Sequence, residues 1–269
     1  MGWPGWWGRV LGAVAAGATC AFAEPGPPFD ASAPASYLID APTAGLPPHG
    51  IVEARAAVFP GGGVEVRVDA GLLDRVEVGM GFGGMKMIGD GQPDWYPRPG
   101  FALRARVLEE SWTMPAISVG VDTRGGGFFD DDRDRFQFKS RGIFAVASKN
   151  YELLGDLALH GGVSRSLETE DDGDPTAFGG LDKSLGERAG IAVEYDLATN
   201  DDARDGVYGR GRGYLNAALR LRPAPQLELR LVVRDMLQNS ERSDTAYGDV
   251  IADEGFGREI SLTWTTAAF

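Results

Sequence analysis

Two runs between Pro99 and Asp122, in which every second residue is apolar, are the feature that most constrains this fold. In residues 101–107 every second residue is apolar, with Arg104 and Arg106 between them, and the same period returns at 117–121. A period of two predicts strands with one apolar and one polar face. The segment between them is long enough only for a tight reversal, which predicts an antiparallel hairpin.

This hairpin is compatible with two kinds of β fold. In a soluble sandwich the apolar face points at a second sheet. In a membrane barrel the apolar face points at lipid, and the charged face lines the interior. One hairpin cannot distinguish the two folds, so the ends of the chain and the spacing of the other strands must decide.

Residues 1–23 predict export. One basic residue, Arg9, precedes an apolar stretch that ends in Ala21-Phe22-Ala23, a small-x-small cleavage pattern. The stretch is shorter than the ~20 apolar residues that cross a bilayer, so we interpret it as a cleaved signal peptide and not as an anchor. Cys20 is the only cysteine of the chain and lies within this segment. We therefore expect no disulfide and no thiol chemistry in the mature chain.

The charge balance argues against nucleic acid as a partner. Removal of residues 1–23 takes away Arg9 and no acidic residue, which leaves 25 basic against 39 acidic residues and a net charge of −14. Such a chain lacks the basic surface that neutralises phosphates. Residues 24–50 are rich in proline and alanine and have no periodic face, so we expect an irregular arm there.

Strand-like runs occupy the rest of the chain, residues 51–269. Eleven are evident from alternation alone, and a twelfth at 176–184, weakened by two glycines, restores a regular alternation of short and long links. Outer-membrane barrels have an even number of strands, short turns at one rim and long loops at the other. We therefore predict a single all-β domain, an antiparallel transmembrane β-barrel of about 12 strands in the outer membrane.

The last strand-like run ends in an aromatic residue, Phe269. A terminal aromatic resembles the signal read by the outer-membrane assembly machinery, which we expect as a partner. Ile260, Leu262 and Trp264 are out of phase with Phe269 by one residue, which requires a bulge or an irregular end. The alternative is an ordinary edge strand that happens to end in an aromatic residue.

Three segments, 97–101, 115–120 and 142–149, resemble parts of the YjbH-like outer-membrane barrel proteins of Gram-negative bacteria. The resemblance extends over residues 41–196 and is clearest over 97–166. It implies an outer-membrane barrel associated with exopolysaccharide production, and hence polysaccharide as a candidate partner.

In a barrel, the polar faces of the strands would line the lumen. The charged residues that we expect there are Glu53, Arg55, Glu65, Arg67, Arg104, Arg106, Arg188, Glu194, Glu228, Arg230 and Arg234. Mixed signs at this density predict an internal ion-pair network and not a selectivity ring of one sign. Twelve strands fall between a filled barrel of eight and an open barrel of sixteen, so an occluded lumen and a narrow channel are both compatible with the sequence.

The two histidines give no catalytic site. His160 is expected to face the lumen, and Ser164 on the same face is roughly 13 Å away along a strand. A nucleophile and its base must lie within hydrogen-bonding distance, so we expect a hydrogen-bonded lumen histidine and no catalytic residue. His49 lies in the proline-rich arm without a periodic context.

Acidic clusters at 130–134, 168–174 and 200–202 fall in the long links. Calcium prefers several carboxylate and carbonyl oxygens, but none of the clusters has the order of an EF-hand loop. We interpret them as solvated loops and expect neither a metal site nor a cofactor. The sharper alternative is divalent bridging to lipopolysaccharide.

The sequence thus predicts a non-enzymatic barrel in contact with outer-membrane lipid and lipopolysaccharide. Its role would be passage or assembly of an exported polysaccharide or small solute, or a structural role in the envelope. Two alternatives stay open: a secreted soluble β-sandwich or barrel that binds a ligand, and an outer-membrane hydrolase.

Overall fold

The computed structural model describes residues 35–169, 172–202, 208–240 and 257–268. The predicted signal peptide, the first part of the predicted arm and the terminal Phe269 lie outside these residues. No helix in the part of the chain that is described is long and apolar enough to cross a membrane.

Twelve antiparallel strands form the wall within the described residues. They are β1 (Ile51–Phe59), β2 (Gly63–Leu72), β3 (Val76–Met85), β5 (Gly100–Leu108), β6 (Ala116–Asp122), β9 (Gly142–Glu152), β10 (Asp156–Arg165), β11 (Thr176–Ser184), β12 (Ala189–Asp196), β13 (Tyr214–Ala224), β14 (Leu227–Arg234) and β15 (Gly257–Ala267). Three further short strands do not contribute to the closed ring: β4 (Asp94–Trp95), which pairs with the end of β3, and β7 (Gly126–Asp130) and β8 (Arg135–Phe138), which pair with each other.

The sheet closes on itself. Each wall strand pairs with the next one along the chain, and β1 pairs both with β2 and with β15, from Ile51↔Ala267 to Val58↔Ile260. The prediction of twelve strands is confirmed, and it includes the weakly alternating β11, which pairs with β10 and β12 over its length. Closure satisfies the backbone groups that an edge strand would leave unpaired.

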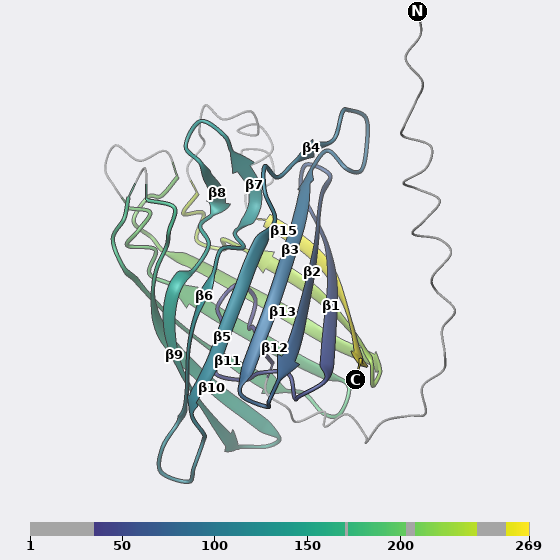
Figure 1. The fold of residues 1–269 in the computed structure, drawn as a ribbon, viewed down its shortest axis with the longest axis vertical. Helices are drawn as coiled ribbons and strands as arrows, with labels where there is room; N and C mark the ends of the chain where they lie inside the picture. Colours follow the sequence, from purple (N-terminus) through teal and green to yellow (C-terminus); the bar gives the residue numbers. More distant parts are fainter. Residues whose placement is uncertain (1–34, 170–171, 203–207, 241–256, 269) are drawn as a thin grey trace, which may run out of the picture.

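The two rims differ as predicted. Short turns at 73–75, 109–115, 153–155, 185–188 and 225–226 share one rim, which we call the turn rim. The long links share the other rim, which we call the loop rim. Figure 1 shows the loop rim at the top and the end of β15 at the bottom. In outer-membrane barrels the short turns face the periplasm.

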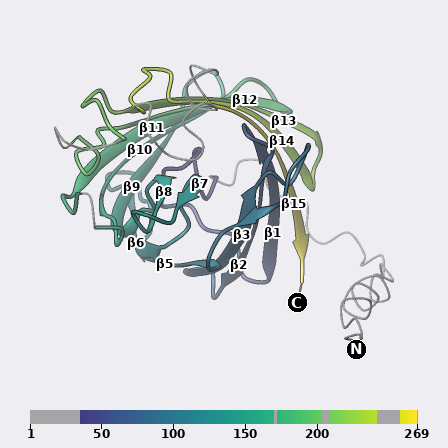
Figure 2. The same ribbon diagram turned by 90° about the horizontal axis from the view of Figure 1, so that it is seen from above.

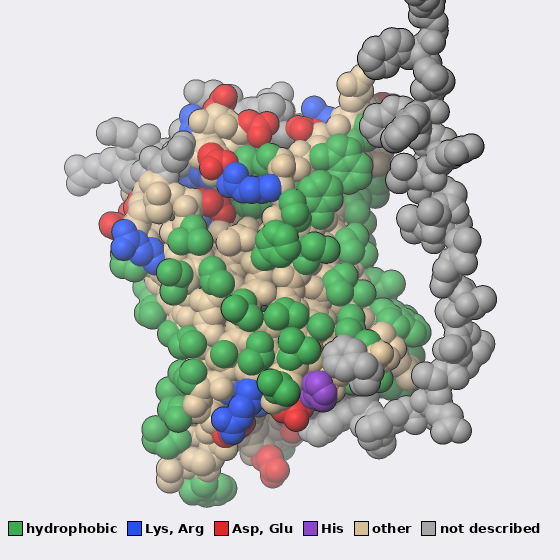
Figure 3. Space-filling model, in the orientation of Figure 1, with side chains coloured by type: hydrophobic (Ala, Val, Ile, Leu, Met, Phe, Trp, Pro, Cys, Tyr) green, Lys and Arg blue, Asp and Glu red, His purple; other side chains and the backbone are tan. Residues whose placement is uncertain are grey.

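The outer face of the wall is apolar. Phe101 and Leu103 of β5 are 55% and 50% exposed, whereas Arg104, the residue after Leu103, points to the opposite face and is 1% exposed. Figure 3 shows hydrophobic side chains over the outer surface between the rims and charged ones near the two ends. A soluble sandwich would bury such residues against a second sheet, so that alternative is wrong. Closure and an apolar outside together are the architecture of an outer-membrane barrel.

Exposed aromatic residues lie close to both rims. Trp112, Tyr151 and Trp264 lie in or near the turns of the turn rim, and Phe82 stacks on Trp95 near the loop rim with ring centroids 5.6 Å apart. Such bands mark the two membrane–water interfaces of a transmembrane barrel. The apolar belt between them is the lipid-facing surface.

The lipid-facing position of Leu103 is testable. Leu103→Arg should lower the free energy of unfolding in lipid vesicles by about 2–4 kcal/mol, because a guanidinium would enter the hydrocarbon layer. Leu154→Arg is the control, since Leu154 is 97% exposed in the turn after β9. Urea titration of the vesicle-inserted protein measures both variants. Equal effects at the two positions would show that β5 does not face lipid.

Candidate functional site: the arm inside the lumen

The part of the arm that the structure describes, residues 35–50, lies inside the barrel. Figure 2 shows this purple segment within the ring of strands. Its base is fixed at the turn rim, where the amide of Gly50 donates to the carbonyl of Gly71 at 3.0 Å and the amide of His49 donates to the carboxylate of Asp74 at 2.7 Å. The sequence predicted an irregular arm but contained no signal for its location.

The arm forms a loop with two legs. The amide of Leu38 donates to the carbonyl of Ala41 at 2.9 Å, and that of Thr43 donates to the carbonyl of Ser36 at 3.1 Å. Residues 38–41 are the tip of this loop. Prolines at 42, 47 and 48 lack an amide donor, which keeps the segment out of the wall. The arm therefore enters the lumen and returns to the turn rim before β1 begins.

The carboxylate of Glu194 anchors the tip. Three consecutive amides, those of Ile39, Asp40 and Ala41, donate to its oxygens at 3.0, 3.0 and 2.9 Å, and the side-chain amide of Asn216 donates at 2.8 Å. Glu194 is 1% exposed. A buried carboxylate is stable only when such donors surround it, so the wall and the arm each satisfy the other.

Wall arginines hold the carbonyl groups of both legs. Arg104 donates from Nη1 to the carbonyls of Ser36 at 2.7 Å and Thr43 at 2.8 Å, and so bridges the two legs. Arg106 donates to the carbonyl of Ala44 at 3.1 Å, and Arg230 donates to that of Leu38 at 3.0 Å. These contacts replace the water that the arm would otherwise bind.

Asp40 is the only charged side chain in residues 35–48. Its carboxylate lies against the guanidinium of Arg234, with Nη1 3.0 Å from both oxygens and Nη2 2.9 Å from Oδ1. Arg141 donates from Nε to the carbonyl of Asp40 at 3.2 Å. Both arginines stand on the wall side of the tip, so Asp40 ties the arm to two regions of the wall.

Tyr37 fixes the first leg. Its hydroxyl donates to Asp122 at 2.9 Å and accepts from Arg124 at 2.8 Å, and the guanidinium of Arg104 lies 4.7 Å from the centre of its ring. A cation over an aromatic ring adds to the hydrogen bonds.

One part of the lumen is apolar. Leu38, Ile39 and Ala41 pack on a wall patch made of Phe144, Val146, Phe178, Ala192, Ala218 and Val232. The inward positions of the wall are therefore not uniformly charged, contrary to the expectation of an ionic lining. The patch matches the arm tip, and burial of these side chains favours the inserted position.

The wall arginines that hold the arm also pair with wall acids. Arg104 pairs with Glu77 at 2.5 Å, Arg124 with Asp69 at 2.7 Å, Arg230 with Glu228 at 2.5 Å and Arg234 with Glu259 at 2.9 Å, and Arg141 pairs with Asp196. This is the network of mixed signs that the sequence predicts. It leaves each guanidinium with a partner that belongs to the wall.

Ten of the eleven predicted lumen residues lie on wall strands with their side chains inside or at the mouth of the barrel. Arg55 pairs with Glu259, Glu65 pairs with Arg67 at 2.8 Å, and Glu53 lines a cavity described below. Arg188 differs: it is exposed in the turn before β12, because β12 begins only at Ala189.

Several residues of the network were not predicted as lumen residues. Glu77 and Glu259 alternate with apolar neighbours, so the period of two could have identified them. Asp122 shares the polar face of Ser118 and Gly120, so the same period could have identified it. Arg124 and Arg141 lie just outside the strands, where the period gives no face. Asp40 lies in an aperiodic segment, and no pattern pointed to it.

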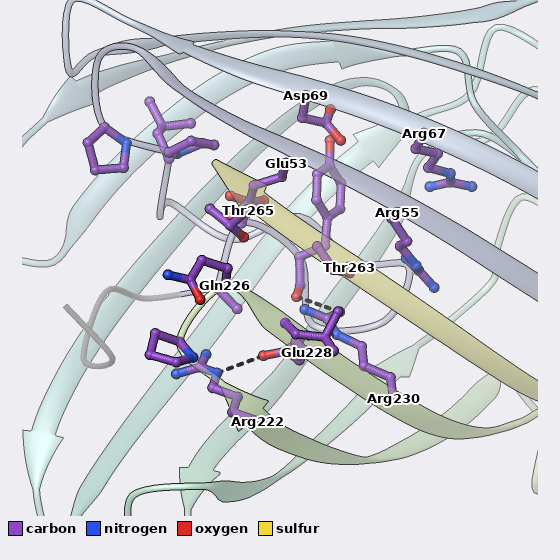
Figure 4. Close-up of a pocket in the computed structure, with 18 residues that line it drawn as sticks. Glu53, Arg55, Arg67, Asp69, Arg222, Gln226, Glu228, Arg230, Thr263 and Thr265 are labelled. Carbon is purple, nitrogen blue, oxygen red and sulfur yellow. Dashed lines mark hydrogen bonds and ion pairs between the residues drawn. The ribbon is translucent and has the colours of Figure 1, made fainter. Parts of the chain in front are cut away.

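Two cavities lie on opposite sides of the arm. One, of about 80 Å³, is lined by the legs at 35–37 and 46–48 and by wall residues that include Glu53, Arg222 and Glu228. Figure 4 shows Arg222 reaching Glu228 across its floor. The other, of about 40 Å³, is lined by Asp40 at the tip and by residues of the loop rim. Each has room for only a few water molecules.

The hairpin of β7 and β8 covers the loop-side mouth. Figure 2 shows both strands within the outline of the ring. Arg135 of β8 makes an ion pair with Asp201 at 2.7 Å, and the amides of Phe136 and Ser140 donate to Glu168 at 3.0 and 3.1 Å. Burial raises the pKa of the Glu168 carboxyl, against the lowering effect of these donors. The lumen is thus narrowed from both ends.

His160 faces the lumen and is hydrogen-bonded, as predicted, and its partner is Ser148. Ser148 Oγ lies 2.7 Å from Nδ1 of His160 and accepts the amide of Ala44 at 2.8 Å. Nε2 of His160 has no hydrogen-bond partner among the described residues. In a catalytic serine–histidine pair, a third group that binds this second ring nitrogen orients the histidine. The contact with Ala44 makes this pair part of the arm's seat.

The acidic clusters of the loop rim are tied into local pairs. Asp130 accepts from the hydroxyl of Tyr208 at 2.7 Å and pairs with Arg133 at 3.0 Å, and Asp134 pairs with Arg98 at 3.2 Å. Within the described ranges, no group of three or more histidine, cysteine or acidic residues is placed to hold a metal ion. Divalent bridging to lipopolysaccharide stays a prediction.

No family model and no curated protein sequence matches the chain. Solved structures with a similar fold include the KdgM porin in complex with disordered oligogalacturonate, at 9% identity and a TM-score of 0.47 over 80% of this chain and 98% of that one. The NanC porin is similar at 10% identity and a TM-score of 0.45, over 79% of this chain and 98% of that one. The outer membrane protein Omp33 of Acinetobacter baumannii is similar at 7% identity and a TM-score of 0.41, over 81% of this chain and 96% of that one. Similarities at this level carry no inference about what this chain does.

The anchoring role of Glu194 is testable by hydrogen exchange. Glu194→Gln removes the charge and leaves one acceptor oxygen where the carboxylate has two, so the hydrogen bonds of the arm amides weaken and exchange at 39–41 should accelerate about tenfold or more. Glu65→Gln is the control, because Glu65 pairs with Arg67 and makes no hydrogen bond or ion pair with the described residues of the arm, 35–50. Mass spectrometry of the protein in lipid vesicles measures both. Unchanged exchange in Glu194→Gln would contradict the anchor.

Proposed function

We propose that the protein is a narrow outer-membrane channel for small solutes and that the arm closes it. The observation that carries this proposal is the position of the arm between the two cavities. A chain segment in the lumen of a membrane barrel either fills it permanently or leaves it to let solute pass. The composition of the wall behind the arm favours the second role.

If the arm filled the lumen permanently, we would expect wall arginines whose only acidic partners belong to the arm. Here the arginines that touch the arm keep wall acids as partners, as Arg104 does with Glu77 and Arg230 with Glu228. After withdrawal of the arm, these pairs would line a hydrated passage without an orphaned arginine charge. Glu194 would lose three donors, but it would gain water in an open lumen.

The arm is held in a way that allows release. It contributes no strand to the wall, and its contacts are hydrogen bonds, the Asp40 pair and a small apolar tip. The closed state is the stable one, and the open state is a minor population. The cargo implied by the sequence resemblance, an exported polysaccharide, would need the same withdrawal. The role proposed here is non-enzymatic.

A reversible disulfide that fixes the arm to the wall tests whether the arm closes the channel. Ala44→Cys with Ser148→Cys, in a Cys20→Ser background, should join the arm to β9, because the amide of Ala44 and Ser148 Oγ are 2.8 Å apart. In planar bilayers the oxidised double variant should lose the openings of the unmodified protein, and a reducing agent should restore them.

Ser148→Cys alone is the matched control, because it removes the contact with His160 without forming the disulfide. It should conduct alike with and without reducing agent. Equal currents from the oxidised and reduced double variant would refute the gate. The absence of openings in every form would favour a purely structural role in the envelope.

A further inference from the structure

The carboxylate of Asp40 occupies a site that the wall builds around it. Arg234 presents both of its terminal nitrogens to this carboxylate, and Arg141 lies against the carbonyl of the same residue. Planar guanidinium against planar carboxylate is the geometry by which arginine recognises acids. Arg141 is 9% exposed and Arg234 is 8% exposed, so both guanidinium groups of the site are buried in the wall.

The site exists independently of the arm. Nη2 of Arg234 also pairs with Glu259 at 2.9 Å, and Arg141 pairs with Asp196. These wall pairs would keep both guanidinium groups in position after the arm leaves. Nη1 of Arg234, which donates to both oxygens of Asp40, would then point into the lumen without that acceptor, while Nη2 would keep Glu259.

The site borders the loop-side cavity through Asp40 and Arg141, whereas Arg234 itself does not line that cavity. Asp40 and Arg141 both line that cavity, together with Arg124 and Lys139. Once Asp40 has left, a solute in this cavity would reach Arg234 through the position that the Asp40 carboxylate fills in the closed state.

We infer that the Arg234 site, which Asp40 fills in the closed state, binds the carboxylate of an acidic small solute in the open state. This inference rests on the proposed channel function and names its solute class. Asp40 acts as an internal substitute for the solute, and the two compete for one site.

The surrounding charges limit the class to singly charged carboxylates. Glu194, Asp196 and Glu259 stand close to the site, so a group with the charge of Asp40 replaces it without a change in electrostatic balance. A doubly charged phosphate would add negative charge beside these acids. Sugar acids carry one carboxylate and hydroxyl groups that suit the polar wall.

Competition couples binding to opening. A solute that binds only where Asp40 has left shifts the population toward the open arm. A neutral sugar of the same size has no differential affinity for the two states and shifts nothing.

The first experiment measures binding separately from conduction. Asp40→Ala should bind D-glucuronate by calorimetry in detergent, and Asp40→Ala with Arg234→Gln should bind it at least tenfold more weakly. Arg220→Gln in the Asp40→Ala background is the matched control, because Arg220 is a lumen arginine paired with Asp182 on β11. It should bind as Asp40→Ala does.

The second experiment measures opening in planar bilayers. D-glucuronate should raise the open fraction of the unmodified protein severalfold, and glucose should leave it unchanged. Arg234→Gln should open more often without solute, because Asp40 loses its partner, and should no longer respond to glucuronate.

The outcomes separate the inference from the channel proposal. Equal binding by Asp40→Ala with and without Arg234→Gln, or equal responses to glucuronate and glucose, would overturn the carboxylate site while leaving the gate intact. Specific binding in a protein that never conducts would support the site and refute the channel.

Discussion

The inserted arm depends above all on one buried carboxylate. Glu194 receives three successive amides of the arm tip, and a charge at this depth is tolerable only with such donors. The tip is thereby oriented so that Asp40 meets Arg234 and the neighbouring apolar side chains meet the wall patch of β9 and β11–β14. The interior thus combines ion pairs formed within the wall with an arm whose polar and apolar groups match that wall.

The wall could be predicted from the sequence because lipid imposes a strict rule on it. A strand with lipid outside and water or polar groups inside must alternate, so period two, strand number and the two kinds of rim are all visible in the residues. The twelfth strand was deduced from link lengths although its glycines weaken the alternation, and its pairing with β10 and β12 confirms it.

The lumen could be predicted only in part. Alternation shows that Arg104 and Glu194 face inward, but it does not show which acid pairs with which arginine, because partners come from strands distant in the sequence, as Arg141 and Asp196 do. The arm has no period at all, since its conformation follows from wall donors and acceptors and not from its own residues. Its insertion, the seat at Ser148 and His160, and the role of Asp40 therefore required the structure.

In the proposed cycle the arm occupies the lumen and leaves it only in a minor state. The most direct measurement is the rate at which a water-soluble maleimide modifies Leu38→Cys in lipid vesicles, in a Cys20→Ser background, because Leu38 is 1% exposed at the tip. The account predicts slow modification that reaches completion and that leaves the channel open, since the adduct no longer fits the wall patch. Modification as fast as in the urea-unfolded chain would show that the arm does not occupy the lumen and would contradict the account.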